Sequence, residues 1–248
     1  MTSDLAIFWP AMAAGLLVAA THVPLGIQVL NRGIVFIDLA VAQIAGLGVV
    51  FAHWLGLEAQ GYGVQLAAFA AAMGGALLLD RTDRMWPEVQ EAVIGVVFIL
   101  AANAAILLLA ANPHGAEHLK DLLTGQILWV NAAWLPLVAL ASAAIMVVWL
   151  GFGPRIGRIG FYLLFAFAVT ISVQLVGIYL VFATLIIPAL ASRRLRKWRM
   201  PAGYALAAAA YGVGLLLSAV SDLPAGPLIV CAMAVGGLAL LMIAEKRV

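Results

Sequence analysis

Charged residues are scarce in this chain, and their scarcity decides its broad class. Asp, Glu, Lys and Arg make up 10% of the 248 residues, against about 25% in an average soluble domain. Apolar residues make up 66%, and the mean hydropathy is +1.13. So few charges cannot cover the large surface that a core of this size leaves exposed to water. The composition excludes a disordered chain and a nucleic-acid binder, and it indicates an integral membrane protein.

Several chemical motifs are also missing. The single cysteine, Cys231, cannot form a disulfide within the chain, which excludes a disulfide-stabilised scaffold. No glycine-rich run is followed by Lys-Ser or Lys-Thr, so the chain cannot hydrolyse ATP itself. Serine nucleophile elbows and paired intramembrane aspartates are absent too, and we expect neither an enzyme nor an intrinsic cofactor. Met1–Leu5 carry no positive charge, which predicts that the first apolar span is not a cleaved signal peptide.

Polar residues divide the apolar sequence into membrane spans. A bilayer core about 30 Å thick needs about 20 apolar residues per helix, and the run after Gly177 is too short for this. We therefore predict an all-α, polytopic membrane helix bundle, a single domain over 1–248, with about eight transmembrane helices and one short or broken segment. The predicted spans are 5–30, 35–56, 62–80, 91–111, 132–150, 160–177, 178–192, 202–220 and 224–244.

Small residues predict how these helices pack. The segments 67–75 and 205–210 consist almost entirely of Ala and Gly, which let helix backbones approach closely. We expect a tightly packed bundle and helix contacts with a second copy, that is, a homodimer.

The positive charges predict the orientation in the bilayer. They gather in alternate connections, whereas Asp4, Glu58, Asp222 and the mixed loop 114–121 occupy the opposite ends. The excess of Lys and Arg in cytoplasmic loops then places the N-terminus outside and the C-terminus in the cytoplasm. The cytoplasmic set is Arg32, Arg81, Arg84, Arg155, Arg158, Arg193, Arg194, Arg196, Lys197, Arg199, Lys246 and Arg247.

Ionisable and polar residues inside the spans are the first candidates for an ion path, because they are costly in a membrane. His22 lies deep in the first span, just before Pro24, which frees a backbone carbonyl. Asp38 and Gln43 lie at the start of the second span, and Glu91 lies at the start of the fourth. Two structural alternatives stay open: His22 bonds to a neighbouring helix, and Asp38 caps its helix or pairs with Arg32.

One predicted external loop has the composition of a metal site. Residues 112–121 contain two histidines and two carboxylates, and within a helix each pair would be four residues apart on one face. Imidazole together with carboxylate suits zinc, manganese or ferrous iron. The candidate ligands are His114, Glu117, His118 and Asp121; an exposed amphipathic loop beside the membrane is the alternative.

Four segments resemble the permease subunits of the zinc/manganese/iron ABC importer family. Val176–Gly177 leads through Leu185-Ile186-Ile187-Pro188-Ala189 to Arg193 and Arg194, in the order of that family's signature. Asp222-Leu223-Pro224-Ala225-Gly226-Pro227 is similar to its Asp-x-Pro-Ala-Gly-Pro motif. Pro24-Leu25-Gly26 with Arg32 and Phe36, and Leu122–Leu128, match two further motifs. These matches come in order and cover nearly the whole chain.

The resemblance implies a multi-pass permease of the bacterial inner (plasma) membrane. Such a permease carries a divalent metal, most often zinc, receives it from an extracytoplasmic binding protein, and is driven by a separate cytoplasmic ATPase. His22, Asp38, Gln43 and Glu91 become candidate ligands on that reading. The basic segment 192–201 becomes the candidate ATPase contact through Arg193, Arg194, Arg196, Lys197 and Arg199, with positive-inside anchoring as its alternative.

The chain also departs from the family pattern. An Asp and a His four apart in the second span of zinc permeases fall here at Leu39 and Gln43, and a further His falls at Ile99. The cytoplasmic segment between the fifth and sixth spans is shortened to 151–160. Two alternatives follow: an ATPase-independent metal carrier or channel with the same fold, and a non-transporting membrane sensor or assembly protein.

Overall fold

The computed structural model describes residues 2–57, 61–109, 125, 127–153 and 155–245, and the regular elements among them are all helices. Nine α-helices occupy this part of the chain, close to the nine predicted apolar runs. They are α1 (Thr2–Arg32), α2 (Ile37–Trp54), α3 (Tyr62–Met85), α4 (Gln90–Leu109), α6 (Leu135–Phe152), α7 (Gly157–Val176), α8 (Ile178–Ala191), α9 (Arg199–Ser221) and α10 (Ala225–Glu245). Short 3-10 helices η1 (Pro87–Val89), η2 (Ile127–Trp129), η3 (Ala132–Trp134) and η4 (Arg196–Trp198) lie between them.

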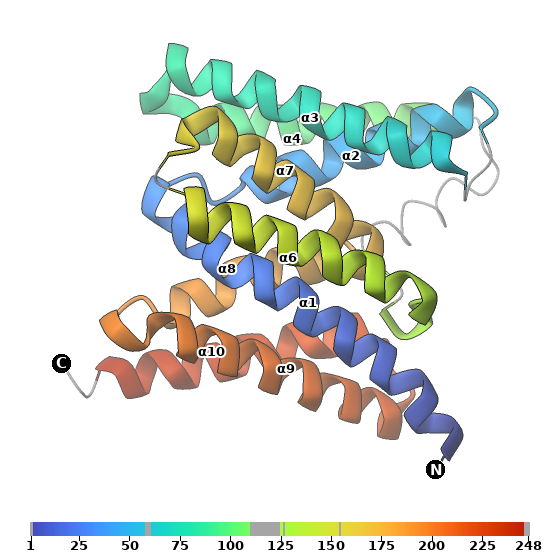
Figure 1. Cartoon of the computed structure of the whole chain (residues 1–248), viewed down its shortest axis with the longest axis vertical. Coiled ribbons are helices and arrows are strands. Elements are labelled where there is room, and N and C mark those ends of the chain that lie inside the picture. Colours follow the sequence, from blue (N-terminus) through green and yellow to red (C-terminus); the bar gives the residue numbers. More distant parts are fainter. Residues whose placement is uncertain (1, 58–60, 110–124, 126, 154, 246–248) are drawn as a thin grey trace.

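The helices run roughly parallel to one another and stack along the long axis of the molecule (Figure 1). One end of that axis holds α3 and α4, which both pack on α2, and the other end holds α9 and α10. Between these groups, α7 packs on α2 and α3, and α1 packs on α6, α8 and α9. The fold is therefore a helix bundle whose two ends are joined through α1, α7 and α8.

Eight helices in the described part of the chain are long and apolar enough to cross a membrane. The exception is α8, with 14 residues, which at 1.5 Å per residue is about 21 Å long and too short for a full crossing. It follows α7 through the single residue Gly177, whose φ of 85° lies in the left-handed region that favours glycine. The prediction of a short segment joined at Gly177 is thus confirmed.

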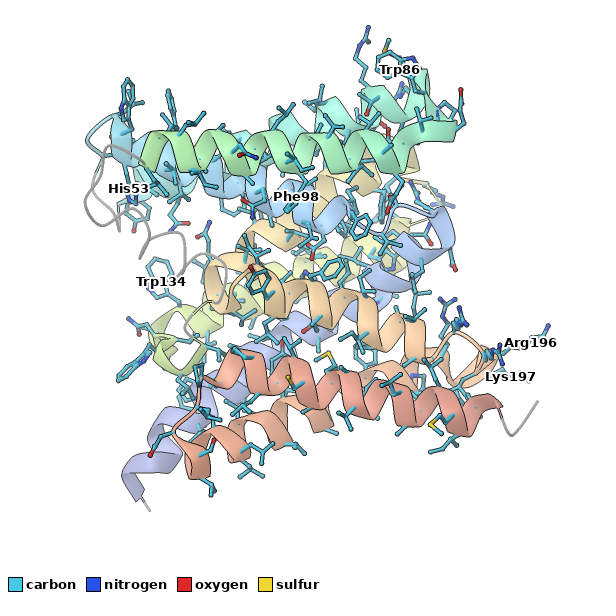
Figure 2. The ribbon with its side chains drawn as sticks, turned by 180° about the vertical axis from the view of Figure 1, so that it is seen from behind. His53, Trp86, Phe98, Trp134, Arg196 and Lys197 are labelled. Atoms are coloured by element: carbon cyan, nitrogen blue, oxygen red, sulfur yellow. The ribbon has the colours of Figure 1, made fainter. Side chains whose placement is uncertain are left out.

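Tryptophans mark the two ends of the spans. Figure 2 shows His53 and Trp134 at one end of the helices and Trp86, Arg196 and Lys197 at the opposite end. Trp134 and Trp86 are 53% and 49% exposed in the chain. Because amphipathic indole rings settle at the headgroup level of a bilayer, we expect Trp134 and Trp86 to lie at its two interfaces.

The predicted close packing of small residues is found between α2 and α3. A Cβ built on Gly48 would come within 2.7 Å of both the Ala67 carbonyl oxygen and the Ala71 methyl group. Ala68 and Ala72 on the same helix are fully buried. The small residues of 67–75 therefore bring the backbones of α2 and α3 together.

Candidate functional site

Asp38 is the most isolated charged group among the described residues. It lies in the first turn of α2 and is 0% exposed. Neither of its carboxylate oxygens has a hydrogen-bond partner within the part of the chain that is described. The alternative in which it pairs with Arg32 is not observed, because the Arg32 guanidinium lies 4.1 Å from the centre of the Phe161 ring instead.

Glu91 reaches the same turn of α2 from another helix. It is the second residue of α4, and its Oε1 accepts a hydrogen bond of 3.2 Å from the backbone N–H of Phe36, the N-cap residue of α2. A carboxylate there stabilises the positive end of α2. The second oxygen, Oε2, is buried and has no partner among the described residues.

The first turn of α2 thus holds the buried Asp38 carboxylate, and the half-buried Glu91 carboxylate of α4 bonds to the N-cap of the same helix. Across Asp38 and Glu91, three buried oxygen atoms have no hydrogen-bond partner in the described chain. A buried carboxylate is stable only when a proton, a hydrogen-bond donor or a cation compensates it. Carboxylate oxygens are among the ligands that manganese and zinc take in proteins.

His22 lies elsewhere, in the middle of α1, and is 0% exposed. Its Nδ1 is 3.1 Å from the Val18 carbonyl oxygen and 2.9 Å from Thr21 Oγ1. Since a carbonyl only accepts, the contact with Val18 assigns the proton to Nδ1 and a lone pair to Nε2. That Nε2 atom is buried without a partner in the described chain. A histidine that binds a metal through Nε2 has this same tautomer, with its proton on Nδ1.

The structure does not combine the predicted ligands into one cluster. Among the described residues, no group of three or more His, Cys, Asp and Glu side chains is placed to hold a metal ion. Gln43 is 6% exposed on α2, five residues beyond Asp38 and so on another face of the helix. The loop candidates His114, Glu117, His118 and Asp121 lie outside the described residues.

The carbonyl freed by Pro24 is already occupied. Proline lacks the N–H that would bond to the residue four positions earlier, which is Ala20. The Tyr204 hydroxyl of α9 donates to that Ala20 carbonyl at 3.0 Å. The freed carbonyl therefore joins α1 to α9 and offers no ligand to an ion beside His22.

The basic segment between α8 and α9 forms an exposed cap at one end of the bundle (Figure 2). Arg199 at the start of α9 donates to Asn31 Oδ1 near the end of α1 at 3.3 Å. Trp198 is 71% exposed. The exposed cations of this cap are Arg193, Arg194, Arg196 and Lys197.

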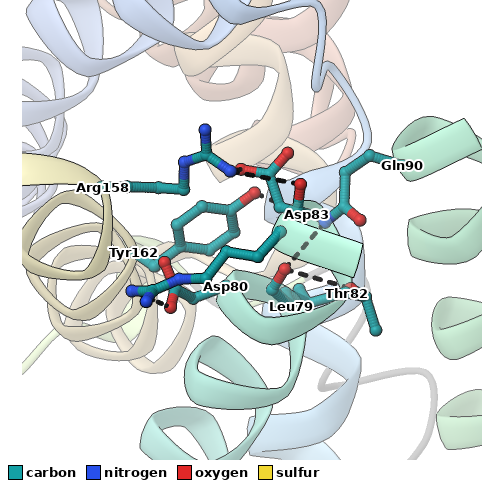
Figure 3. Close-up of polar contacts among 8 residues, drawn as sticks. Leu79, Asp80, Thr82, Asp83, Gln90, Arg158 and Tyr162 are labelled. Carbon is teal, nitrogen blue, oxygen red and sulfur yellow. Dashed lines mark hydrogen bonds and ion pairs between the residues drawn. The ribbon is translucent and has the colours of Figure 1, made fainter. Parts of the chain in front are cut away.

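Sequence reasoning missed a polar network at the same end of the molecule (Figure 3). Arg158 of α7 bonds to Asp83 of α3 twice, at 3.2 Å to its carboxylate and at 3.1 Å to its carbonyl oxygen. Gln90 of α4 donates to the Leu79 carbonyl at 2.9 Å and lies 3.4 Å from the Tyr162 hydroxyl. The residues that this network joins are up to 75 positions apart in the chain, so no local sequence pattern predicts it.

The fold is that of a polytopic helical membrane protein. The sequence model of the ABC 3 transport family matches residues 4–152 and 149–244. The chain therefore belongs to the ABC 3 transport family.

Two solved structures have a similar fold. One is PsaBC from Streptococcus pneumoniae in complex with Fab, with a TM-score of 0.75 at 20% identity, covering 96% of this chain and 92% of that one. The other is described as an inward-facing metal-chelate-type ABC transporter, with a TM-score of 0.68 at 18% identity, covering 97% of this chain and 86% of that one. At these sequence identities the structural similarity establishes a shared fold.

Proposed function

We propose that this chain is the permease subunit of an ATP-driven importer for a divalent metal ion, with zinc as the first candidate and manganese or iron as the others. It works as a homodimer in the bacterial plasma membrane, with its N-terminus outside. Family membership and the metal-type transporter of similar fold support this proposal.

The observation that carries it is the first turn of α2, where Asp38 is buried and the N–H of the N-cap residue Phe36 donates to Glu91. Three buried carboxylate oxygens there have no partner among the described residues, and in the ionised state they need a compensating cation inside the membrane bundle. Removing such charges from water costs several kcal/mol each in practice, and a divalent cation offsets that cost by binding both groups. His22, Gln43 and the loop residues His114, Glu117, His118 and Asp121 are proposed as further contacts along the path.

We also propose two partners. An extracytoplasmic binding protein delivers the ion, and a cytoplasmic ATPase drives the conformational cycle. The basic cap offers the ATPase an electrostatic contact through four exposed cations, Arg193, Arg194, Arg196 and Lys197, and through the part-buried Arg199 beside them. Copurification of an ATPase with the tagged chain, and its loss when these five residues are changed to Ser, tests that contact.

Metal binding tests the proposal most directly. We expect the purified chain in nanodiscs to bind zinc or manganese, and Asp38→Asn and Glu91→Gln each to weaken binding by about tenfold or more, as for the loss of a charged contact. Glu88→Gln is the matched control, because Glu88 is exposed in η1 just before Glu91. Equal affinity in all four proteins would remove Asp38 and Glu91 from the path.

A specific observation favours a second candidate, an ATPase-independent metal carrier. The connection from α6 to α7 is only residues 153–156, and the two matched parts of the family meet at 149–152, the end of α6. Saturable zinc or manganese flux into liposomes that contain only this chain, driven by an ion gradient, would establish the carrier. Flux that needs ATP and a copurified ATPase would establish the importer.

A further inference from the structure

Two adjacent residues at the start of α4 bind two different helices. The Glu91 carboxylate accepts the Phe36 N–H at 3.2 Å and so holds the first turn of α2. The preceding side chain, Gln90, is 3% exposed and donates to the Leu79 carbonyl of α3 at 2.9 Å. The first turn of α4 is therefore fixed between α2 on one side and α3 on the other.

The Gln90 side chain also extends this link to α7. Its Nε2 lies 3.4 Å from the hydroxyl of Tyr162, a residue that is 1% exposed. The same hydroxyl lies against the Asp83 carboxylate, which Arg158 holds at 3.2 Å one turn earlier on α7. Figure 3 shows these side chains converging from α3, α4 and α7.

We propose that Gln90 and Tyr162 are positioning residues for Glu91, which they hold at the first turn of α2 where Asp38 lies. Displacement of α7 at its Arg158 end then moves the Glu91 carboxylate relative to Asp38. The inference rests on the proposed function for the identity of the ion, but the placement of Glu91 stands without it.

The covalent geometry of the helix explains why anchoring Gln90 also fixes Glu91. Gln90 and Glu91 are consecutive in one helical turn, so their side chains leave the helix about 100° apart. When both are anchored, the turn cannot rotate about the helix axis without breaking a hydrogen bond. When the Gln90 anchors are lost, only the hydrogen bond from Phe36 to Glu91 opposes that rotation.

Hydrogen exchange at Phe36 tests the placement directly. We expect Gln90→Leu and Tyr162→Phe, both close in shape to the native side chains, to speed amide exchange in the peptide covering 33–38 by roughly twofold to tenfold in nanodiscs. Glu91→Gln sets the scale for a weakened anchor. Unchanged exchange in both variants would overturn the inference, whether or not the chain binds metal.

Asn103→Leu is the matched control. Asn103 lies on the same helix and donates to the Ile99 carbonyl at 2.9 Å. The residue is exposed, and this hydrogen bond stays within α4. We expect its loss to leave exchange at 33–38 unchanged. An equal rise in exchange in this variant would show a general loosening of α4 and would contradict a positioning role.

Metal titration separates this inference from the proposed function. We expect Gln90→Leu to raise the apparent Kd for zinc or manganese about threefold to tenfold, with the thermal midpoint of the metal-free protein little changed. If wild type binds neither metal, the proposed function fails and the exchange experiment still decides the placement. If wild type binds metal and both variants bind it with unchanged Kd, the positioning role is refuted.

Discussion

Gly125 packs against the backbone of Gly177, the residue at which α7 ends and α8 begins. Both glycines have left-handed backbone, with φ of 63° and 85°. A Cβ on Gly125 would collide with the Val176 carbonyl, so the contact has no room for a side chain. The short helix α8 is thus held at its N-cap, Gly177, by a backbone contact from Gly125, 52 positions earlier.

We expect Gly125→Ala to destabilise the protein. The substitution places a Cβ in a left-handed conformation, which costs about 1–2 kcal/mol, and adds the collision with Val176. Gly95→Ala is the control, because a Cβ at that helical position meets nothing within 4 Å. The thermal midpoint in detergent measures both, and an equal midpoint for the two variants would contradict the tight contact.

We expect Tyr204→Phe to weaken the contact between α1 and α9. Without the hydroxyl, the carbonyl of Ala20 that Pro24 leaves free has lost its donor. Hydrogen bonds between membrane helices contribute about 0.6 kcal/mol on average and about 1.7 kcal/mol at most. Unfolding in SDS measures the loss, with Tyr179→Phe, at an exposed position, as the control that should unfold like wild type.

We expect the Arg158–Asp83 pair to show coupling in a double-mutant cycle. Arg158→Asp and Asp83→Arg each place like charges opposite one another, and the exchanged pair restores the attraction. The side chains are 46% and 19% exposed, so the coupling should be about 0.5–1 kcal/mol and should fall in high salt. Strictly additive effects on stability would show that the two helices are held by other contacts.

We expect the basic cap to face the cytoplasm. In a Cys231→Ser background, Lys197→Cys should react with an impermeant maleimide only from the cytoplasmic side. Tyr62→Cys, at a residue 82% exposed at the start of α3, should react only from outside. Labelling of intact cells and inverted vesicles measures this, and the reverse pattern would invert the proposed orientation.

Much of the fold could be predicted because a membrane demands long apolar runs. The main error concerns α3, which was predicted to end at 80 but continues to Met85. The Arg84–Asp80 ion pair at 2.8 Å lies one helical turn apart and extends the helix beyond its apolar part. Charged side chains that end an apolar run need not end the helix that contains it.

The candidate site was harder to predict, because its contacts join distant parts of the chain. Asp38 and Glu91 were identified as costly intramembrane charges, but nothing local shows that Glu91 accepts from Phe36, 55 residues away. The Gln90 and Tyr162 contacts span 72 residues and involve residue types that are ordinary at a membrane surface. Such pairings depend on how the helices pack, which cannot be predicted from the hydrophobic periodicity of the sequence.

The positions of Trp134 and Trp86 have a consequence for the lipid. Trp134 and Trp86 lie at opposite ends of helices of fixed length, so both reach the headgroups only in a bilayer of matching thickness. In lipids with longer acyl chains the surrounding leaflet must thin, at a modest cost for each ångström of mismatch. Acyl-chain length thus becomes a variable that changes the energy of the folded protein without changing any residue.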